Sequence, residues 1–237
     1  MGMSAARHAL ILTLLTVVVS AALVYFFINV PVVPAQASSQ AVPIDGLFVV
    51  LFSIASVFFA LCVVALVYSV VAFRSRPGDN EDGPGIQGHN WLEFTWTLVP
   101  FIIVMVLAVY GAIVLGDITR ASPQEMEIKV VAAQWSWQFE YPQIGASTAE
   151  LRLPVNRPVL LKLNSLDVVH SFWVPEFRVK QDAVPGMETV LRITPTKIGD
   201  YSLECAELCG LLHAYMTAPV KVVEEEDFQG WVREQKH

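Results

Sequence analysis

Five side chains that can bind a metal lie within twelve residues of one another, at Cys205, Glu207, Cys209, His213 and Met216. Sulfur together with imidazole selects copper or zinc, and the thioether favours copper because zinc sites use Cys, His and carboxylate ligands. A mononuclear blue-copper centre needs one Cys, two His and an axial Met. The second cysteine instead allows two thiolates to bridge a pair of copper ions that share one electron.

Each copper ion of such a pair needs an imidazole, and the chain has only five histidines. His8 and His89 fall on the far side of a membrane in the topology predicted below, and His237 lies at a chain terminus. His170 is therefore the second candidate. Two alternatives stay open at this point: a disulfide between the two cysteines, which an oxidising compartment permits, and a zinc site of two Cys and two His.

The first half of the chain is predicted to hold this centre at a membrane. Its 120 residues carry 10 charged side chains, against 27 in the remaining 117. A span of about 20 apolar residues crosses the hydrocarbon core, and three uncharged runs qualify, at 9–28, 47–73 and 94–116. Arg74 and Arg76 follow the second run, and positive charge marks the cytoplasmic side. The C-terminal half is therefore predicted to lie outside the cytoplasm.

The first apolar run allows two interpretations. Arg7, the run itself and the sequence Ala35-Gln36-Ala37 are typical of a signal peptide that ends at Ala37. The run is longer than the roughly 7–15 apolar residues of most signal peptides, which favours a transmembrane helix. We therefore expect a signal peptide or an extra transmembrane helix at 1–37, a transmembrane helical hairpin at 38–120 and an extracytoplasmic domain at 121–237.

The extracytoplasmic domain is predicted to be all-β. Apolar residues alternate in short runs separated by Pro, Gly, Asn and Asp, a pattern typical of a β-sandwich of about 100 residues. Trp135, Trp137, Phe139 and Tyr141 alternate in this way and are expected to share one sheet face. A change of phase near Ala132 suggests a bulge or a switch between sheets. The acidic C-terminal segment predicts a short helix.

The sequence resembles cytochrome c oxidase subunit II. The spacing Cys-x-Glu-x-Cys-x-x-x-His-x-x-Met, with a His 35 residues before the first Cys, is similar to the dinuclear CuA site of that family. The resemblance extends over residues 44–223 and includes the segments 93–100, 134–141, 167–175 and 180–186. It implies a membrane-anchored, cupredoxin-like Greek-key β-sandwich.

The resemblance also implies which atoms bind the metals. Cys205 and Cys209 would bridge the two coppers, and His170 and His213 would each bind one. The weak axial ligands would be the thioether of Met216 on one copper and the backbone carbonyl of Glu207 on the other.

Further roles follow from the same resemblance. The side chain of Glu207 would bind a magnesium ion shared with the catalytic subunit. Electrons from cytochrome c would enter at Trp135, with Glu140 and Asp167 as docking carboxylates. Glu93 would lie at the cytoplasmic mouth of a proton-uptake path, although a carboxylate at the start of a membrane helix is more often an interfacial anchor.

We therefore expect the electron-accepting subunit of a proton-pumping terminal oxidase, which passes electrons to haem in the catalytic subunit for reduction of O₂ to water and is not catalytic alone. The resemblance implies that the haem lies in the partner subunit, and the chain has no Cys-x-x-Cys-His motif for covalent haem attachment. Expected partners are catalytic subunit I, other oxidase subunits, cytochrome c and membrane lipid, with no nucleic acid. The expected location is a bacterial plasma membrane, with the β-domain in the periplasm or cell exterior, in preference to the mitochondrial inner membrane. The alternatives are a CuA-bearing subunit of a nitric oxide reductase and a membrane-anchored copper carrier.

Overall fold

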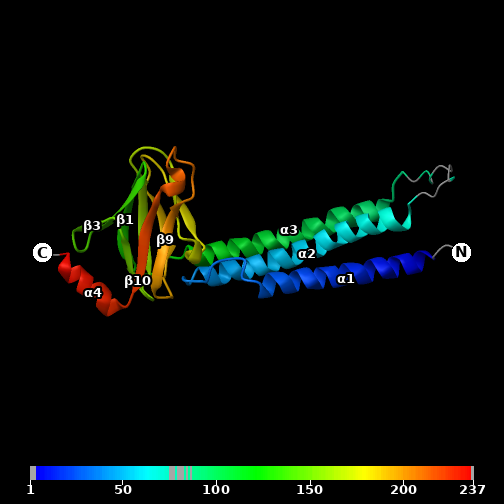
Figure 1. Ribbon diagram of the computed structural model, residues 1–237, viewed down its shortest axis with the longest axis horizontal. Coiled ribbons are helices and arrows are strands. Elements are labelled where there is room, and N and C mark those ends of the chain that lie inside the picture. The colour runs from blue at the N-terminus through cyan, green and yellow to red at the C-terminus, as the bar shows by residue number, and fades with distance from the viewer. Residues whose placement is uncertain (1–3, 75–77, 79–82, 84, 86, 236–237) are drawn as a thin grey trace. The chain divides into compact units, whose positions relative to one another are not determined.

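The computed structural model describes residues 4–74, 78, 83, 85 and 87–235 (Figure 1). The chain divides into two compact units. One comprises residues 1–32 with 46–112, and the other comprises residues 33–45 with 113–237. Arg76 of the predicted cytoplasmic loop lies outside the described residues.

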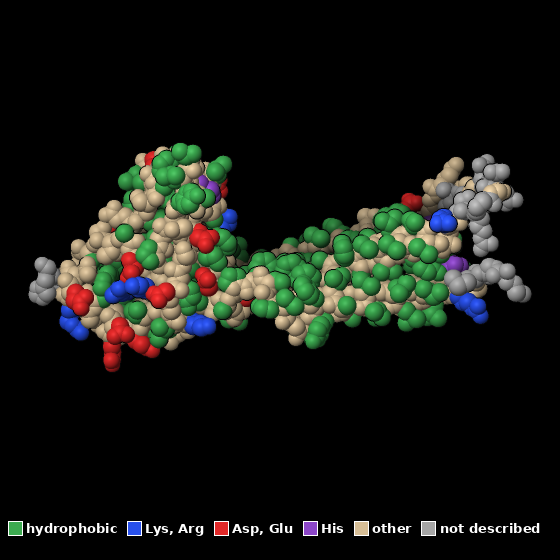
Figure 2. Space-filling model, in the orientation of Figure 1, with side chains coloured by type: hydrophobic (Ala, Val, Ile, Leu, Met, Phe, Trp, Pro, Cys, Tyr) green, Lys and Arg blue, Asp and Glu red, His purple; other side chains and the backbone are tan. Residues whose placement is uncertain are grey.

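Three long apolar helices form the first unit: α1 (Ala5–Asn29), α2 (Ala41–Ala72) and α3 (Asn90–Ile118). All three are long and apolar enough to cross a membrane, which confirms the three predicted runs. Hydrophobic side chains cover their surface, as Figure 2 shows, so lipid must take the place of water around them. Helices α1 and α2 are in contact, because His8 Nδ1 lies 2.6 Å from the Tyr68 hydroxyl.

The second unit contains two five-stranded sheets, in the orders β3-β2-β1-β5-β8 and β4-β10-β9-β6-β7. The strands of the first sheet are β1 (Met126–Ala133), β2 (Ser136–Tyr141), β3 (Ala146–Thr148), β5 (Val159–Ser165) and β8 (Thr189–Ile193). Those of the second are β4 (Leu151–Pro154), β6 (His170–Trp173), β7 (Lys180–Ala183), β9 (Gly199–Cys205) and β10 (Thr217–Val223). Short 3₁₀ helices occur at η1 (Pro175–Phe177) and η2 (His213–Tyr215), and the predicted terminal helix is α4 (Glu225–Glu234). The predicted fold class, a cupredoxin-like β-sandwich that follows membrane helices, is confirmed.

The core of the sandwich lies between the two sheets and follows the alternation of the sequence. In β5 every second residue is buried, and Leu161 and Leu163 are among those fully shielded from solvent. Strand β2 buries Trp137, Phe139 and Tyr141 on the same side, as predicted. Burial of a large apolar side chain contributes about 1.5–3 kcal/mol, so these strands form a rigid support for the loops at their ends.

The predicted bulge or sheet switch near Ala132 is wrong. The chain instead reverses direction, and Gln134 and Trp135 form a two-residue turn between β1 and β2, with Ala133 paired to Ser136. The change of phase in the apolar pattern therefore marks a hairpin. Trp135 lies in the turn and does not share the buried face of β2.

Residues 33–45, which precede and begin α2, are part of the β-domain. The Ala37 N–H donates to the carbonyl of Glu176 at 3.0 Å, and the Ser38 hydroxyl donates to the carbonyl of Phe177 at 2.9 Å. Arg178 is 6% exposed and donates through Nε to Asp45 Oδ1 at 2.8 Å. Backbone hydrogen bonds and one shielded ion pair therefore hold this segment to the sheets.

Candidate metal centre

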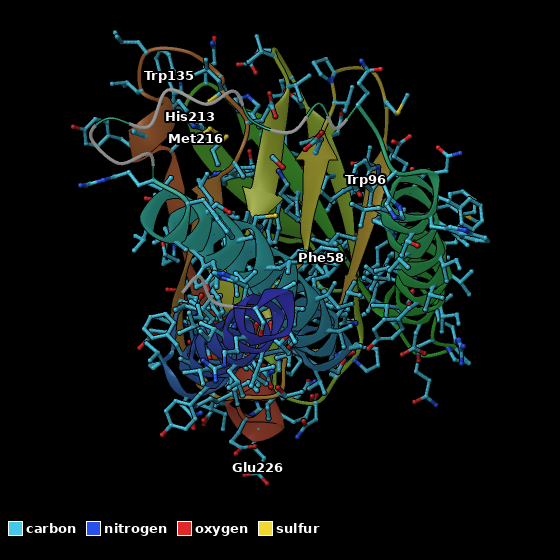
Figure 3. All side chains as sticks on the ribbon, turned by 90° about the vertical axis from the view of Figure 1, so that its right-hand side faces the viewer. Phe58, Trp96, Trp135, His213, Met216 and Glu226 are labelled. Atoms are coloured by element: carbon cyan, nitrogen blue, oxygen red, sulfur yellow. The ribbon has the colours of Figure 1, made fainter. Side chains whose placement is uncertain are left out.

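The candidate ligands lie at one end of the sandwich, where β6 begins and β9 ends. His170 is the first residue of β6 and Cys205 is the last residue of β9. The two strands are adjacent and antiparallel, with Phe172 opposite Cys205, so His170 and Cys205 are brought to the same sheet end. The loop after β9 returns through η2 and carries His213 and Met216, which Figure 3 shows at the end of the domain that also bears Trp135.

The six predicted ligand atoms converge. The two cysteine Sγ atoms are 3.7 Å apart. Cys205 Sγ lies 3.9 Å from His170 Nδ1 and 3.2 Å from the carbonyl oxygen of Glu207. Cys209 Sγ lies 3.6 Å from His213 Nδ1 and 3.7 Å from Met216 Sδ. Each thiol therefore has one imidazole beside it and one weaker donor.

The donor set fits a pair of copper ions. Two sulfurs flanked by two imidazoles provide the soft and borderline ligands that copper prefers. A tetrahedral zinc site would use the two Cys and two His and would leave no role for Met216, which is fully buried with its sulfur beside Cys209. Cys205 and Cys209 are free thiols in this structure, so the disulfide alternative is not formed.

Asp167 orients the buried ligand His170. Its Oδ1 lies 2.8 Å from His170 Nε2, which leaves Nδ1 directed towards Cys205. Partial burial raises the pKa of Asp167, but hydrogen bonds from His170 and from the backbone N–H groups of Gln134 and Val168 outweigh it and lower the pKa to about 2. The ionised carboxylate accepts a hydrogen bond from the Nε2–H of His170. The Nδ1 lone pair is then free for a metal, and carboxylate partners commonly orient metal-bound histidines in this way.

The thiol of Cys209 resists ionisation while no cation is bound. Burial, together with the hydrogen bond and charge of Cys205, raises its pKa to about 11. A coordinating thiol is deprotonated by the metal that it binds. Metal binding to this site therefore releases protons, and its affinity must fall as the pH falls.

Trp135 is half-buried, and its indole nitrogen is shielded from solvent. It lies against Gly210, where an added Cβ would be 3.3 Å from the indole Cζ2. Glu207 is exposed, although its carbonyl faces the centre. Glu140 is half-buried on β2, opposite Lys129.

Glu93 lies in the first turn of α3, in the helical unit. Its carboxylate accepts a hydrogen bond from the His89 N–H at 2.9 Å. A negative charge at a helix N-terminus is favoured by the free N–H groups of the first turn. This contact gives Glu93 a local structural role beside the predicted one in proton uptake.

Analysis of the sequence missed two features of the site. Gln134 donates from Nε2 to the carbonyl of Cys209 at 2.7 Å, so the β1–β2 turn is fastened to the ligand loop. Leu208, Leu211 and Tyr215, each within two residues of a candidate ligand, are 79%, 88% and 80% exposed and are called the apolar rim below. The sequence held one signal for this rim: large apolar side chains in a loop that is rich in candidate metal ligands.

Comparison with known proteins agrees with the geometry. The family model for the periplasmic domain of cytochrome c oxidase subunit II matches residues 144–223, and the model for its transmembrane domain matches residues 28–113. Cytochrome c oxidase subunit 2 of Thermostichus vulcanus is 34% identical over 85% of this chain and 77% of its own length. The same subunit of Synechocystis sp. is 31% identical over 94% of this chain and 82% of its own length. Among solved structures, the periplasmic domain of subunit II of cytochrome oxidase of Bradyrhizobium japonicum is 30% identical, covering 49% of this chain and 97% of that chain with a TM-score of 0.46.

Proposed function

Because the chain belongs to the cytochrome c oxidase subunit II family, we propose that the end of its β-sandwich holds a dinuclear copper centre through which electrons enter the oxidase. The chain is a subunit of an oxidoreductase complex. The alternatives, a subunit of a nitric oxide reductase and a copper carrier, are not favoured, because the similar proteins named above are subunits of cytochrome c oxidase.

In this proposal the thiolates of Cys205 and Cys209 and the imidazoles of His170 and His213 would hold the metals. The thioether of Met216 and the carbonyl of Glu207 would be weaker donors. When bound, the copper pair supplies a store for one electron that is shared across both metals. Two of the donors, His170 and Cys205, lie on strand ends, and the others lie in the loop after β9. A donor set made only of protein atoms would leave no open position of the kind that catalytic metal sites keep.

We further propose that reduced cytochrome c docks beside Trp135. The apolar rim of Leu208, Leu211 and Tyr215 offers the desolvated contact that the middle of a protein interface needs. Acidic residues exceed basic residues by 16 to 11 in the last 117 positions. Such a surface attracts a basic partner and raises its association rate. Glu140 and Asp167 are the proposed docking carboxylates, and the partial exposure of both is compatible with that role.

The remaining assignments concern the catalytic subunit and the membrane. The transmembrane family model covers residues 28–113, which include α2 and most of α3, so these helices anchor the chain in a membrane, and the β-domain lies outside the cytoplasm. We place it in a bacterial plasma membrane, beside a catalytic subunit that contains the haem. The exposed side chain of Glu207 is free to bind a magnesium ion shared with that subunit. Glu93 is assigned to proton uptake at the cytoplasmic side.

The observation that carries this proposal is the convergence of two free thiols and two imidazoles at one sheet end. Its test is the metal content and the absorption and electron paramagnetic resonance spectra of the purified oxidase. We expect two copper ions in this chain with a delocalised mixed-valence spectrum, which C205S and C209S abolish. C62S, at a cysteine in α2, is the matched control and should retain the spectrum. One copper or one zinc ion per chain would overturn the proposal.

A further inference from the structure

The β1–β2 turn is fastened to both segments that carry the ligands. On one side the Gln134 backbone N–H donates to Asp167 Oδ2 at 2.7 Å, and the other oxygen of Asp167 holds His170. On the other side the Gln134 side-chain Nε2 donates to the Cys209 carbonyl at 2.7 Å. One residue therefore bonds to the loop before β6 through its backbone and to the loop after β9 through its side chain.

The ligand loop is shaped to receive this turn. Gly210 follows Cys209 and has a φ of +123°, a conformation that side-chain-bearing residues rarely adopt. A Cβ at this position would lie 3.0 Å from Gln134 Nε2 and 3.3 Å from Cζ2 of Trp135. The absence of a side chain at Gly210 thus allows the amide and the indole to pack against the loop together.

We propose that Gln134 is a positioning residue for electron transfer: its amide fixes Trp135 against the loop of Cys209. This inference rests on the proposed two-copper centre and on the entry of electrons at Trp135. In this step one electron leaves reduced cytochrome c and one electron arrives at the centre. Gln134 itself exchanges no electron or proton.

A role confined to stability is less well supported by the structure. Gln134 is exposed, and five residue pairs hold β1 to β2 without its side chain. Replacement of the side chain leaves the backbone N–H bond to Asp167 in place. Loss of the amide should therefore act mainly on the Cys209 loop and on the indole beside it.

The test uses Q134M in the assembled oxidase, because methionine keeps the length of the side chain and removes the donor. The matched control is Q138M, since Gln138 lies four residues further along the same hairpin, is also exposed, and donates to Ser147 Oγ at 2.7 Å, away from the ligands. G210A is a second variant: its Cβ would crowd the amide and the indole from the side of the loop, and it would also strain the loop backbone at φ +123°. Haem absorption reports assembly, and stopped-flow absorption of the copper centre reports its reduction by cytochrome c or by a small soluble reductant.

We expect Q134M and G210A to slow reduction by cytochrome c about tenfold, the lower end of the effect of losing a group that supports a metal ligand. We also expect a shifted copper spectrum. Reduction by the small reductant does not depend on Trp135, so its rate should equal that of the wild type. Q138M should match the wild type in all three measurements. If Q134M matches Q138M, or if it fails to assemble while Q138M assembles, the inference is wrong. A wild-type oxidase that lacks the two-copper spectrum would instead overturn the proposed function itself.

Discussion

Replacing Asp167 with alanine should weaken both the folded β-domain and its hold on metal. The structure gives the carboxylate four hydrogen-bond donors, namely His170 Nε2, the backbone N–H groups of Gln134 and Val168, and the Ser165 hydroxyl at 3.3 Å. The first three hold its pKa at about 2, against an ordinary value of 3.8. A shift of this size corresponds to about 2 kcal/mol of stability at full strength. Because the side chain is 30% exposed, screening by solvent reduces this to roughly 1–2 kcal/mol.

The sign of the pH dependence follows from the lowered pKa. The contribution of Asp167 is fully present above the ordinary pKa and is lost as the pH falls from about 4 towards 2. The assay is thermal unfolding of the metal-free full-length chain, followed by tryptophan fluorescence between pH 3 and pH 7. D167A should be less stable than the wild type at pH 7, and the gap should narrow at pH 3. Copper affinity of D167A should fall at least about tenfold, because the carboxylate orients His170.

The control for D167A is D200A, at an exposed aspartate on β9 that lies outside the centre. D200A should leave both the unfolding temperature and the copper affinity close to those of the wild type. The reasoning is refuted if D167A and D200A behave alike, or if the stability gap of D167A is as large at pH 3 as at pH 7.

Four further substitutions, one of them a control, probe the candidate metal centre, the ion pair of Arg178 and the docking surface. M216L conserves volume in the core, so it should cost less than about 1.5 kcal/mol in stability while altering the copper spectrum and reduction potential; an unchanged spectrum would exclude the thioether as a ligand. R178A removes one partner of a shielded ion pair and leaves the charge of Asp45 with the neutral amide of Gln36, so we expect a loss of about 3 kcal/mol. The control is R157A, at the ion pair of Arg157 and Glu225, whose side chains are 38% and 49% exposed. It should cost less than about 1 kcal/mol in stability. Equal melting temperatures for R178A and R157A would contradict the role of Arg178. L211S should raise the KM for cytochrome c without changing the copper spectrum, because the side chain is 88% exposed on the apolar rim; an unchanged KM would remove Leu211 from the docking surface.

The cluster of candidate ligands could be predicted from the sequence because it depends on residue types at short spacing. Five of the six donor atoms come from the single segment between Cys205 and Met216. His170 followed only from a census of the histidines, since no local pattern joins it to a loop 35 residues away. The contact becomes visible only when β6 and β9 are paired.

The alternating pattern located seven strands, namely β1, β2, β4, β5, β8, β9 and β10, and the shared buried face of β2. It failed where short-range rules are ambiguous. Near Ala132 a bulge and a tight turn both change the phase of a period-two pattern, and only the pairing of β1 with β2 distinguishes them. Residues 33–45 gave no apolar periodicity because Ala37, Ser38 and Ala41 are small. Their burial depends on hydrogen bonds to residues more than 130 positions away.

The register of β6 against β9 decides whether the centre can form. In antiparallel strands a slip of one residue moves every side chain to the opposite face. With Phe172 opposite Cys205, His170 is buried beside the thiol. A slip would turn its ring away from Cys205 and would also bury Trp173, now only partly covered, in place of Phe172. The packing of Phe172 in the core and the hydrogen bond from His170 to Asp167 therefore favour the same register, so the forces that fold the sandwich also place the ligand.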